Sequence, residues 1–119
     1  MPERSRLPGR LAPRHKVWVL CDGLFLMGPN YLRFLRAVDE TGTIREGGKA
    51  VGWSYRTCLN RVRRMERALG RPVLLTARGG SSHGGSRLSP EARRLVDGFD
   101  RWHAAVSAFA RKSFARHLG

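Results

Sequence analysis

The pattern of apolar and polar residues predicts an amphipathic helix over residues 30–41. Its apolar residues fall at positions i, i+3, i+4 and i+7, so they share one face: Tyr31, Phe34, Leu35 and Val38. Most charged residues of the stretch lie off this face, as expected for a helix that covers a core. Asn30 can cap the start of the helix, and Gly42 suits the left-handed residue that follows its end.

Two more helices, joined by a tight turn, are predicted within residues 43–70. Thr43 and Glu46 form a capping box, in which the hydroxyl accepts from the Glu46 N–H and the carboxylate returns to the Thr43 N–H. This helix should end near residues 51–52. It contains Gly47-Gly48, and each glycine costs about 1 kcal/mol relative to alanine. We expect one of the two to be required by a close helix–helix contact, which excludes a β-carbon.

The second helix of this pair combines a buried stripe with a basic outer face. Ser54 caps its start and Gly70 ends it. The expected inward residues are Tyr55, Cys58, Leu59, Val62, Met65 and Leu69. At about 100° per residue, the opposite side carries Arg56, Thr57, Asn60, Arg64 and Arg67, flanked by Arg61 and Arg63. A short capped helix, a glycine-containing turn and a basic helix are typical of a helix-turn-helix.

Two β-hairpins are predicted on either side of these helices. Apolar runs flank Asp22-Gly23 within residues 16–27, and this dipeptide favours a type I′ turn, in which both central residues need a positive φ. Nearly every position of the runs is apolar, so helices or a second subunit should cover both faces. Residues 73–78 read as a strand and Arg87-Leu88 as its return, which makes the glycine-rich residues 79–86 the tip of a wing.

A long last helix is predicted from Ser89-Pro90-Glu91 to about residue 116, with the serine as cap and the proline in the first turn. Apolar residues follow in it at spacings of 4, 3, 4 and 3: Leu95, Phe99, Trp102, Val106 and Phe109. Such a seam favours packing along one straight partner helix, and we interpret it as a dimer interface. The alternative is packing within the chain, against helix 31–41 and the first hairpin.

Length and charge indicate one domain with a polyanionic partner. The chain has 119 residues and a formal net charge of +14, which suggests DNA, RNA or an anionic membrane as partner. The alternative is a merely cationic soluble protein. Residues 1–14 contain three prolines and four arginines, so we expect a flexible basic arm before a domain at residues 15–119. Such an arm can follow phosphates or enter a minor groove, or it can be a plain disordered tail.

The apolar segments and cysteines indicate a cytoplasmic protein. No apolar run approaches the roughly 20 residues that span a bilayer, and no secretory signal pattern is present, so we expect no membrane partner. Cys21 and Cys58 both sit among apolar residues, as buried reduced thiols do.

Catalysis and metal binding find no support in the residue pattern. The histidines are scattered at His15, His83, His103 and His117, and neither cysteine has a neighbouring base. The wing does not end in the Gly-Lys-Ser/Thr of a phosphate-binding loop. We expect no enzyme activity, no cofactor and no metal site. His103 lies beside the apolar seam and is interpreted as a structural or interface residue.

Four segments together resemble a known family: ETGTIREGGKAVGWSYRTCLN, GRPVLL, GGSSHGG and RLSPEARRL. They are similar to the winged helix-turn-helix domain of the ModE family of molybdate-responsive regulators, over about residues 16–110. Thr43-Ile44 stands for the family's Ser-Ile, and Gly52-Trp53-Ser54-Tyr55 for its Gly-Met-Ser-Tyr. The resemblance implies DNA binding and dimerisation. Since the chain ends at Gly119, without room for the family's molybdate-binding domains, we expect no molybdate site.

The expected fold is therefore mainly α with small β: a winged helix-turn-helix of the LysR type, with an N-terminal hairpin and a long C-terminal helix. The expected function is that of a dimeric, sequence-specific transcriptional regulator of double-stranded DNA. Residues 54–69 would enter the major groove, and wing residues 79–86 would lie on the backbone or in the minor groove. The alternatives are a nucleic-acid-binding or nucleoid protein of low specificity and, more weakly, a protein-interaction module.

The candidate DNA-binding residues divide by chemistry. Arg56, Thr57 and Asn60 can read base edges, whereas Arg61, Arg63 and Arg64 suit phosphates. In the wing, glycines and serines let backbone N–H groups reach phosphate, unless the loop is an ordinary flexible tip. The full set is Ser54, Tyr55, Arg56, Thr57, Asn60, Arg61, Arg64, Arg78, Ser82, His83 and Arg87.

Overall fold

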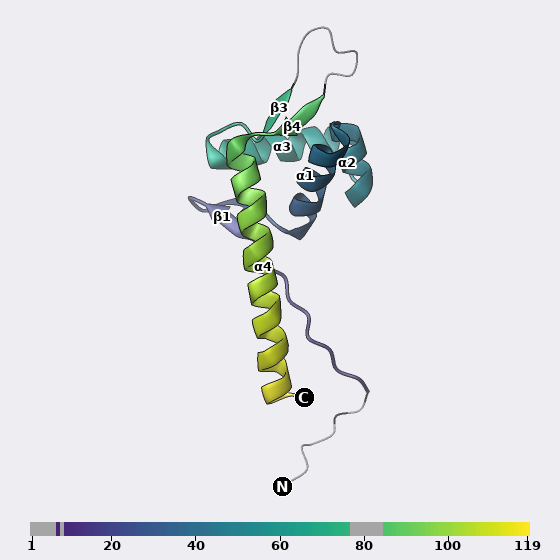
Figure 1. The fold of residues 1–119 in the computed structure, drawn as a ribbon, viewed down its shortest axis with the longest axis vertical. Helices are drawn as coiled ribbons and strands as arrows, with labels where there is room; N and C mark the ends of the chain where they lie inside the picture. Colours follow the sequence, from purple (N-terminus) through teal and green to yellow (C-terminus); the bar gives the residue numbers. More distant parts are fainter. Residues whose placement is uncertain (1–6, 8, 77–84) are drawn as a thin grey trace.

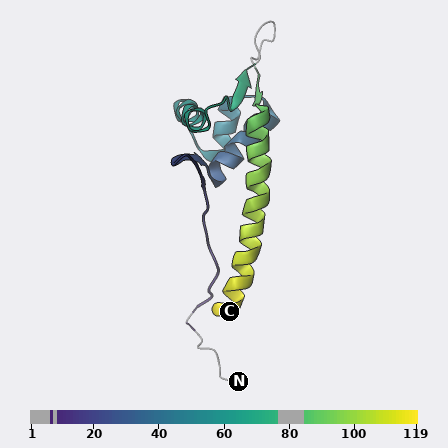
Figure 2. The same cartoon turned by 90° about the vertical axis from the view of Figure 1, so that its left-hand side faces the viewer.

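The computed structural model describes residues 7, 9–76 and 85–119, and it confirms a mainly helical fold with two small hairpins (Figure 1). The elements in order are β1 Val19–Cys21, β2 Leu24–Met27, α1 Pro29–Thr41, α2 Ile44–Val51, α3 Tyr55–Leu69, β3 Leu74–Thr76, β4 Ser86–Leu88 and α4 Pro90–His117. Helices α1, α2 and α3 form a head beneath the β3–β4 hairpin. Helix α4 starts in the head and extends well beyond it (Figures 1 and 2).

The first hairpin has the predicted turn but is only partly covered, because β2 is exposed beside the turn and buried at its other end. Asp22 and Gly23 have φ values of 50° and 82°, as a type I′ turn requires. Leu26 and Met27 are buried in the core, whereas Leu20 and Leu24 are each 53% exposed. The expectation that both faces are covered therefore fails within this chain.

Helix α1 starts two residues earlier than the predicted Asn30 cap implied. Gly28 is the residue at the cap position and Pro29 takes the first turn, so the prediction that Asn30 caps the helix is wrong. Proline suits this position because it has no N–H to satisfy and its φ is already helical. The Asn30 side chain instead accepts from Arg33 Nη1 (3.1 Å). At the other end, Gly42 has the predicted left-handed conformation, with φ 81°.

Helix α2 packs so closely on α1 and α3 that both of its glycines are needed. A β-carbon at Gly47 would meet Val38 Cγ2 and lie 3.2 Å from the Phe34 carbonyl oxygen. One at Gly48 would lie 2.5 Å from Cys58 Sγ and 2.7 Å from the Trp53 carbonyl oxygen. The sequence predicted such a contact for only one of the two glycines.

The capping box at the start of α2 is half formed. Thr43 Oγ1 accepts from the Glu46 N–H (3.0 Å) as predicted. The Glu46 carboxylate, however, accepts from Lys49 Nζ (3.0 Å) instead of returning to the Thr43 N–H. One predicted bond of the two is therefore present.

The core lies between α1, α3, the first hairpin and the start of α4. Helix α3 contributes Cys58, Val62, Met65 and Ala68. The predicted stripe is correct at its centre, but Tyr55 at its end is 44% exposed. Burial raises the pKa of the Cys58 thiol, so this cysteine stays protonated as expected. Cys21 is only half-buried, contrary to the prediction for both thiols.

Helix α4 is attached to the head by its first turns and by ion pairs to α1. Its buried residues are Ala92, Val96 and Phe99. Arg93 donates to both carboxylate oxygens of Asp39 (3.0 Å each), and Arg36 Nη2 donates to Asp100 (2.8 Å). The remaining two-thirds of this 28-residue helix carry the exposed part of the predicted seam.

The base of the wing is tied to the helices. Glu66 of α3 accepts from the N–H groups of Val73 (2.8 Å) and Leu74 (3.5 Å). Strands β3 and β4 then pair antiparallel, and the Ser86 N–H donates to the Gly42 carbonyl oxygen (2.7 Å). The predicted wing tip falls largely on residues 77–84, which lie outside the described residues.

Gly48→Ala should lower the free energy of unfolding by about 1–3 kcal/mol, as overpacking does. The new β-carbon would meet the fully buried Cys58 and a backbone oxygen, and neither can withdraw easily. The matched control is Gly98→Ala, because Gly98 is also inside a helix but nothing described lies within 4 Å of its added β-carbon. It should stabilise the protein by up to about 1 kcal/mol. Urea unfolding of both variants tests the contrast, which two stabilising substitutions would contradict.

Asp39→Asn should make the free energy of unfolding change less as the pH is lowered from neutral to about 2. Hydrogen bonds from Arg93 hold the pKa of the Asp39 carboxyl below its usual value, against the opposing effect of burial. Because the folded pKa is the lower one, the pair stabilises the fold fully above about pH 4 and loses this contribution as the pH falls through the folded pKa. We expect the variant to lose about 1 kcal/mol at neutral pH and much less near pH 2.

Urea unfolding at the two pH values measures this difference. Asp22→Asn is the control, because it removes the same charge from a turn where asparagine is equally suited to a positive φ. Its stability relative to the parent should change little at either pH. An equal loss for Asp39→Asn at both pH values would show that the carboxylate charge is not what holds α1 to α4.

Candidate nucleic-acid interface

The turn between α2 and α3 is held by an aromatic cluster. Gly52 ends α2 with φ 75°, and the Trp53 N–H donates to the Gly48 carbonyl oxygen (2.9 Å). The Trp53 ring lies 5.1 Å from the ring centres of both Tyr31 and Phe34 on α1. This packing fixes the direction in which α3 leaves the turn.

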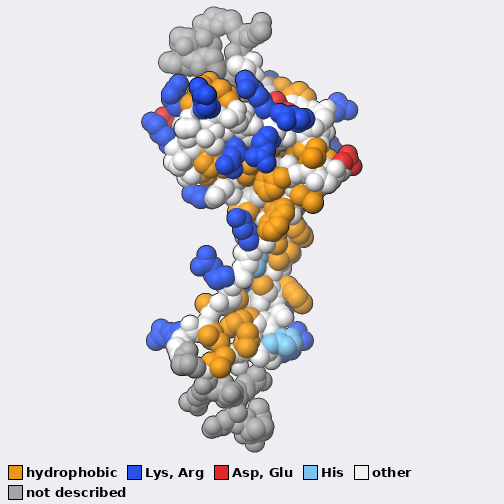
Figure 3. Space-filling model, turned by 180° about the vertical axis from the view of Figure 1, so that it is seen from behind, with side chains coloured by type: hydrophobic (Ala, Val, Ile, Leu, Met, Phe, Trp, Pro, Cys, Tyr) orange, Lys and Arg blue, Asp and Glu red, His pale blue; other side chains and the backbone are white. Residues whose placement is uncertain are grey.

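Helix α3 presents a basic face to the surroundings. Its exposed polar residues are Arg56, Asn60, Arg63, Arg64 and Arg67. The single acidic residue of α3, Glu66, is turned toward the wing base, where it accepts backbone hydrogen bonds. Figure 3 shows Lys and Arg side chains spread over the head of the molecule, with little acidic surface between them. The exposed face of α3 is therefore uniformly positive.

Two of the candidate residues serve the start of α3 itself. Ser54 Oγ accepts from the Thr57 N–H (3.1 Å) and its hydroxyl donates to Thr57 Oγ1 (3.1 Å). Ser54 is the cap, as predicted, and Thr57 is half-buried beside it. Their hydroxyls are thus engaged in shaping the helix end.

Tyr55 is paired with a residue that the sequence did not single out. The Arg45 guanidinium of α2 lies 4.6 Å above the centre of the exposed Tyr55 ring, a cation–π distance. This contact crosses the turn, so the periodicity within either helix could not reveal it. It places a further cation beside the start of α3.

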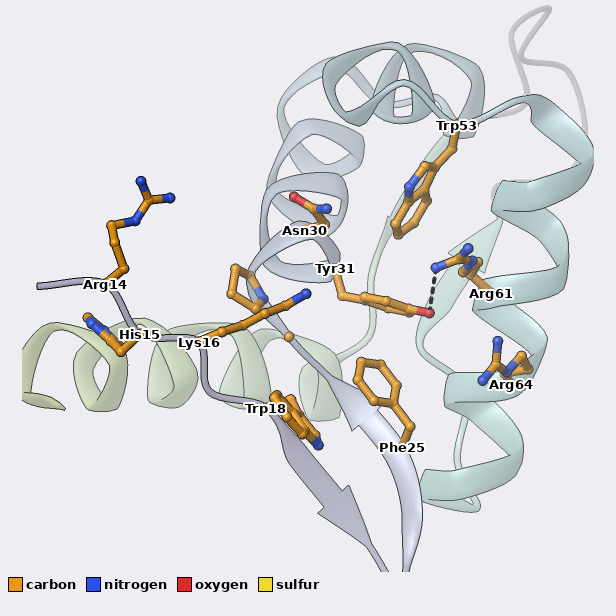
Figure 4. A pocket seen from close by; sticks show the side chains of 12 residues that line it. Arg14, His15, Lys16, Trp18, Phe25, Asn30, Tyr31, Trp53, Arg61 and Arg64 are labelled. Atoms are coloured by element: carbon orange, nitrogen blue, oxygen red, sulfur yellow. Dashed lines mark hydrogen bonds between the residues drawn. The ribbon is translucent and has the colours of Figure 1, made fainter. Parts of the chain in front are cut away.

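Arg61 points inward rather than toward solvent. Its Nη1 donates to the Tyr31 hydroxyl (3.0 Å), and its guanidinium lies 4.8 Å from the centre of the Trp53 ring (Figure 4). The predicted phosphate contact of this residue is untested, and its geometry separates it from the exposed arginines of α3. Arg64, one turn further along, lies at the edge of the same pocket.

The wing candidates are only partly described. Arg87 is exposed on β4, where it pairs with Leu75 of β3. Arg78, Ser82 and His83 lie outside the described residues.

The predicted dimer seam divides into a packed and an exposed part. Phe99 is buried in the core, so the alternative of packing within the chain holds for this residue. Leu95, Phe99 and Trp102 line a groove of about 530 Å³ together with Val19 and Leu69. Further along α4, Val106 is half-buried and Phe109 is 65% exposed.

His103 connects α4 to the chain that precedes β1. Its ring stacks on Phe99 with centres 5.9 Å apart, and the His15 ring lies 5.5 Å away. His15 Nε2 is also within 3.0 Å of Ser107 Oγ. The structural role predicted for His103 agrees with these contacts.

Residues 7, 9–76 and 85–119 contain neither a metal-binding cluster nor a membrane-spanning helix. No three His, Cys, Asp or Glu side chains there gather in a way that could hold a metal ion. No helix in this part of the chain has the length and apolar character to cross a membrane.

Comparison with known proteins identifies relatives at low identity. No family model matches the chain. It is 32% identical over 92 residues to the molybdenum-pterin-binding protein MopB of Rhodobacter capsulatus. The matched segment covers 77% of this chain and 34% of MopB. It is 30% identical over 81 residues to the transcriptional regulator ModE of Haemophilus influenzae. This matched segment covers 68% of this chain and 31% of ModE. The chain is distantly similar to the ModE and Mop proteins. It spans about a third of the length of these ModE and Mop relatives, over their N-terminal region.

A solved structure of similar fold confirms the fold that the sequence predicted. The crystal structure of the CbnR DNA-binding domain in complex with DNA superposes with a TM-score of 0.55 at 21% identity. The match covers 71% of this chain and 92% of the CbnR chain. The ModE-like chain therefore has the fold of a helix-turn-helix DNA-binding domain.

Proposed function

We propose that this chain is a sequence-specific regulator of transcription that binds double-stranded DNA as a homodimer. The observation that carries the proposal is the exposed face of α3, which is basic along its whole length and belongs to a helix-turn-helix fold. The similarity to ModE, itself a transcriptional regulator, supports it. Such a regulator would act in the cytoplasm, where the DNA is. No cofactor, metal or molybdate site enters the proposal.

The exposed residues of α3 divide along the helix into residues that would contact base edges and residues that would contact phosphates. At 1.5 Å per residue the helix is roughly 22 Å long, so only one end can lie deep in a major groove. Arg56 and Asn60 are exposed on the first two turns, where they can reach guanine and adenine edges. Arg63, Arg64 and Arg67 follow on the later turns and suit phosphates.

Two further elements would complete the contact. Arg45, which lies over Tyr55, is placed to reach a phosphate beside the reading end of α3. Wing residues 79–86 would follow the backbone or enter the minor groove, with Arg87 at their base. Both contacts neutralise phosphate and add affinity rather than specificity.

The free part of α4 supports dimerisation. The helix is roughly 42 Å long at 1.5 Å per residue, and its second half extends beyond the head (Figure 2). Trp102, near the middle of the helix, is 43% exposed, and Phe109 in its second half is 65% exposed. A second copy could cover them by packing its own α4 along the seam.

A DNA-binding protein of low specificity is the second candidate. The net charge of +14 favours it, because phosphate contacts alone give strong binding to any duplex. Asn60, exposed amid the arginines of α3, favours the regulator, since an amide adds little to phosphate binding but can pair with adenine.

Arg56→Ala should lower affinity mainly for the preferred site, by about 1–3 kcal/mol, because it removes a base contact. Arg64→Ala should weaken binding to preferred and random duplexes alike and reduce the salt slope by about one unit. Arg111→Ala is the control: it removes the same charge from an exposed position near the far end of α4. Fluorescence anisotropy with both duplexes across a salt series measures all three.

The regulator and the low-specificity candidate predict different outcomes here. A parent protein that binds preferred and random duplexes equally at physiological salt would exclude the regulator. Identical effects of Arg56→Ala and Arg64→Ala on affinity for the two duplexes would refute the division between base-contacting and phosphate-contacting residues. If Arg111→Ala lowered DNA affinity as much as Arg56→Ala or Arg64→Ala, only the total charge of the protein would matter for binding.

Phe109→Glu should convert the dimer to a monomer at micromolar concentration, because it places a charge in the seam. Ala104→Glu is the matched control, since residue 104 lies on the opposite side of α4 at about 100° per residue. Both positions are exposed, so neither change should unfold the chain. Sedimentation equilibrium distinguishes the states. A monomeric parent, or equal effects of the two variants, would contradict the seam.

A further inference from the structure

A pocket of about 1000 Å³ lies between the N-terminal chain, the first hairpin, the start of α1 and the side of α3 (Figure 4). Four aromatic side chains line it: Trp18, Phe25, Tyr31 and Trp53. Three of them form a continuous cluster, since Tyr31 lies 4.8 Å from Phe25 and 5.1 Å from Trp53 between ring centres. The volume falls at the upper end of the range for small-molecule sites. These walls suit a flat ring.

The charged residues of the pocket are all of one sign. Arg14, Lys16, Arg61 and Arg64 line it together with His15, and no described lining residue is acidic. The ion pairs in the described part of the chain involve other residues. Arg61 is half-buried, and its contacts are the neutral Tyr31 hydroxyl and the faces of the Trp53 and Tyr31 rings, none of which carries a negative charge. A half-buried guanidinium without a carboxylate favours an anion beside it.

The start of α1 adds to the positive electrostatic potential of the pocket. Gly28, Pro29 and Asn30 line the pocket, so the positive end of this 13-residue helix faces it. Among the described residues, no side chain caps this end, and its first turn contains no acidic residue. The helix dipole therefore acts in the same direction as the surrounding cations.

The pocket lies on a different flank of α3 from the proposed reading face. At about 100° per residue, Arg61 lies roughly 45° from the centre of the buried stripe, whereas Arg56 and Arg67 lie almost opposite that centre. The Arg61 side chain points into the pocket, and Arg64 lies at its rim (Figure 4). The two surfaces therefore meet at Arg64 only.

The geometry points to a binding site for a small planar aromatic anion, that is, an aromatic ring that carries a phosphate or a carboxylate. The ring would lie against the exposed Trp18 and the half-buried Trp53, and the anionic group would face Arg61, Lys16 and the start of α1. Because Trp53 belongs to the turn before α3, the bound molecule would contact the segment that positions the recognition helix.

Calorimetry with three probes tests the site without any DNA. Adenosine 5′-monophosphate combines a ring with an anion, adenosine has the ring alone, and inorganic phosphate has the anion alone. Since stacking and charge both contribute, the monophosphate should bind at least about tenfold more tightly than either of the other two. Absence of saturable binding by the monophosphate, or equal binding of inorganic phosphate, would overturn the proposal.

Two substitutions on the first hairpin locate the bound molecule. Trp18 and Leu20 are 52% and 53% exposed, but only Trp18 lines the pocket. Trp18→Ala should weaken monophosphate binding at least about fivefold through lost stacking, and Leu20→Ala should leave it unchanged. Circular dichroism confirms that both variants remain folded. Equal effects of the two would place the binding elsewhere and overturn the assignment.

A fully paired DNA duplex distinguishes a free small molecule from DNA as the source of this chemistry. The monophosphate should still bind when the duplex is saturating. If the duplex displaces it competitively, and Trp18→Ala weakens both ligands equally, the pocket belongs to the DNA face and the proposal fails. A chain that binds the monophosphate but no duplex would instead contradict the proposed regulator and leave the pocket assignment standing.

Discussion

The close packing of α2 against α1 and α3 is the contact on which the position of the recognition helix depends. Gly47 and Gly48 allow it, because β-carbons at these positions would meet Val38 on one side and Cys58 and the Trp53 carbonyl on the other. Trp53 then fills the angle of the turn with its ring against α1. The helix-propensity cost of two glycines is thus offset by a fixed geometry for α3.

A second constraint is the use of the acidic residues. Glu66 holds the base of the wing, and Asp39 and Asp100 join α1 to α4 through arginines. Each of these carboxylates has an internal partner, and Glu66 is the single acidic residue of α3, so no exposed acidic side chain of that helix offsets its arginines. The one acidic residue of α3 thus holds the wing base in place, and the exposed face of this helix keeps its positive charge.

Sequence periodicity predicted the elements well because the core is built from their apolar stripes. Tyr31, Phe34, Leu35 and Val38 are all buried as expected. Errors arose where contacts between elements decide the outcome. Pro29 displaced Asn30 as the start of α1, and Tyr55 at the end of its stripe lies beyond the core and meets Arg45. The inward direction of Arg61 depends on Tyr31, thirty residues earlier in the chain, which no local pattern reveals.

The central claim is that α3 reads sequence, and selection of bound sites from a random pool of DNA duplexes tests it most directly. Because the chain is proposed to act as a dimer, the selected sites should share two similar half-sites with a fixed separation of about one helical turn or a multiple of it. Guanine and adenine contacts from Arg56 and Asn60 should appear as the positions of strongest preference. Recovery of sequences no different from the starting pool would contradict the account, since it would show that α3 binds phosphates alone.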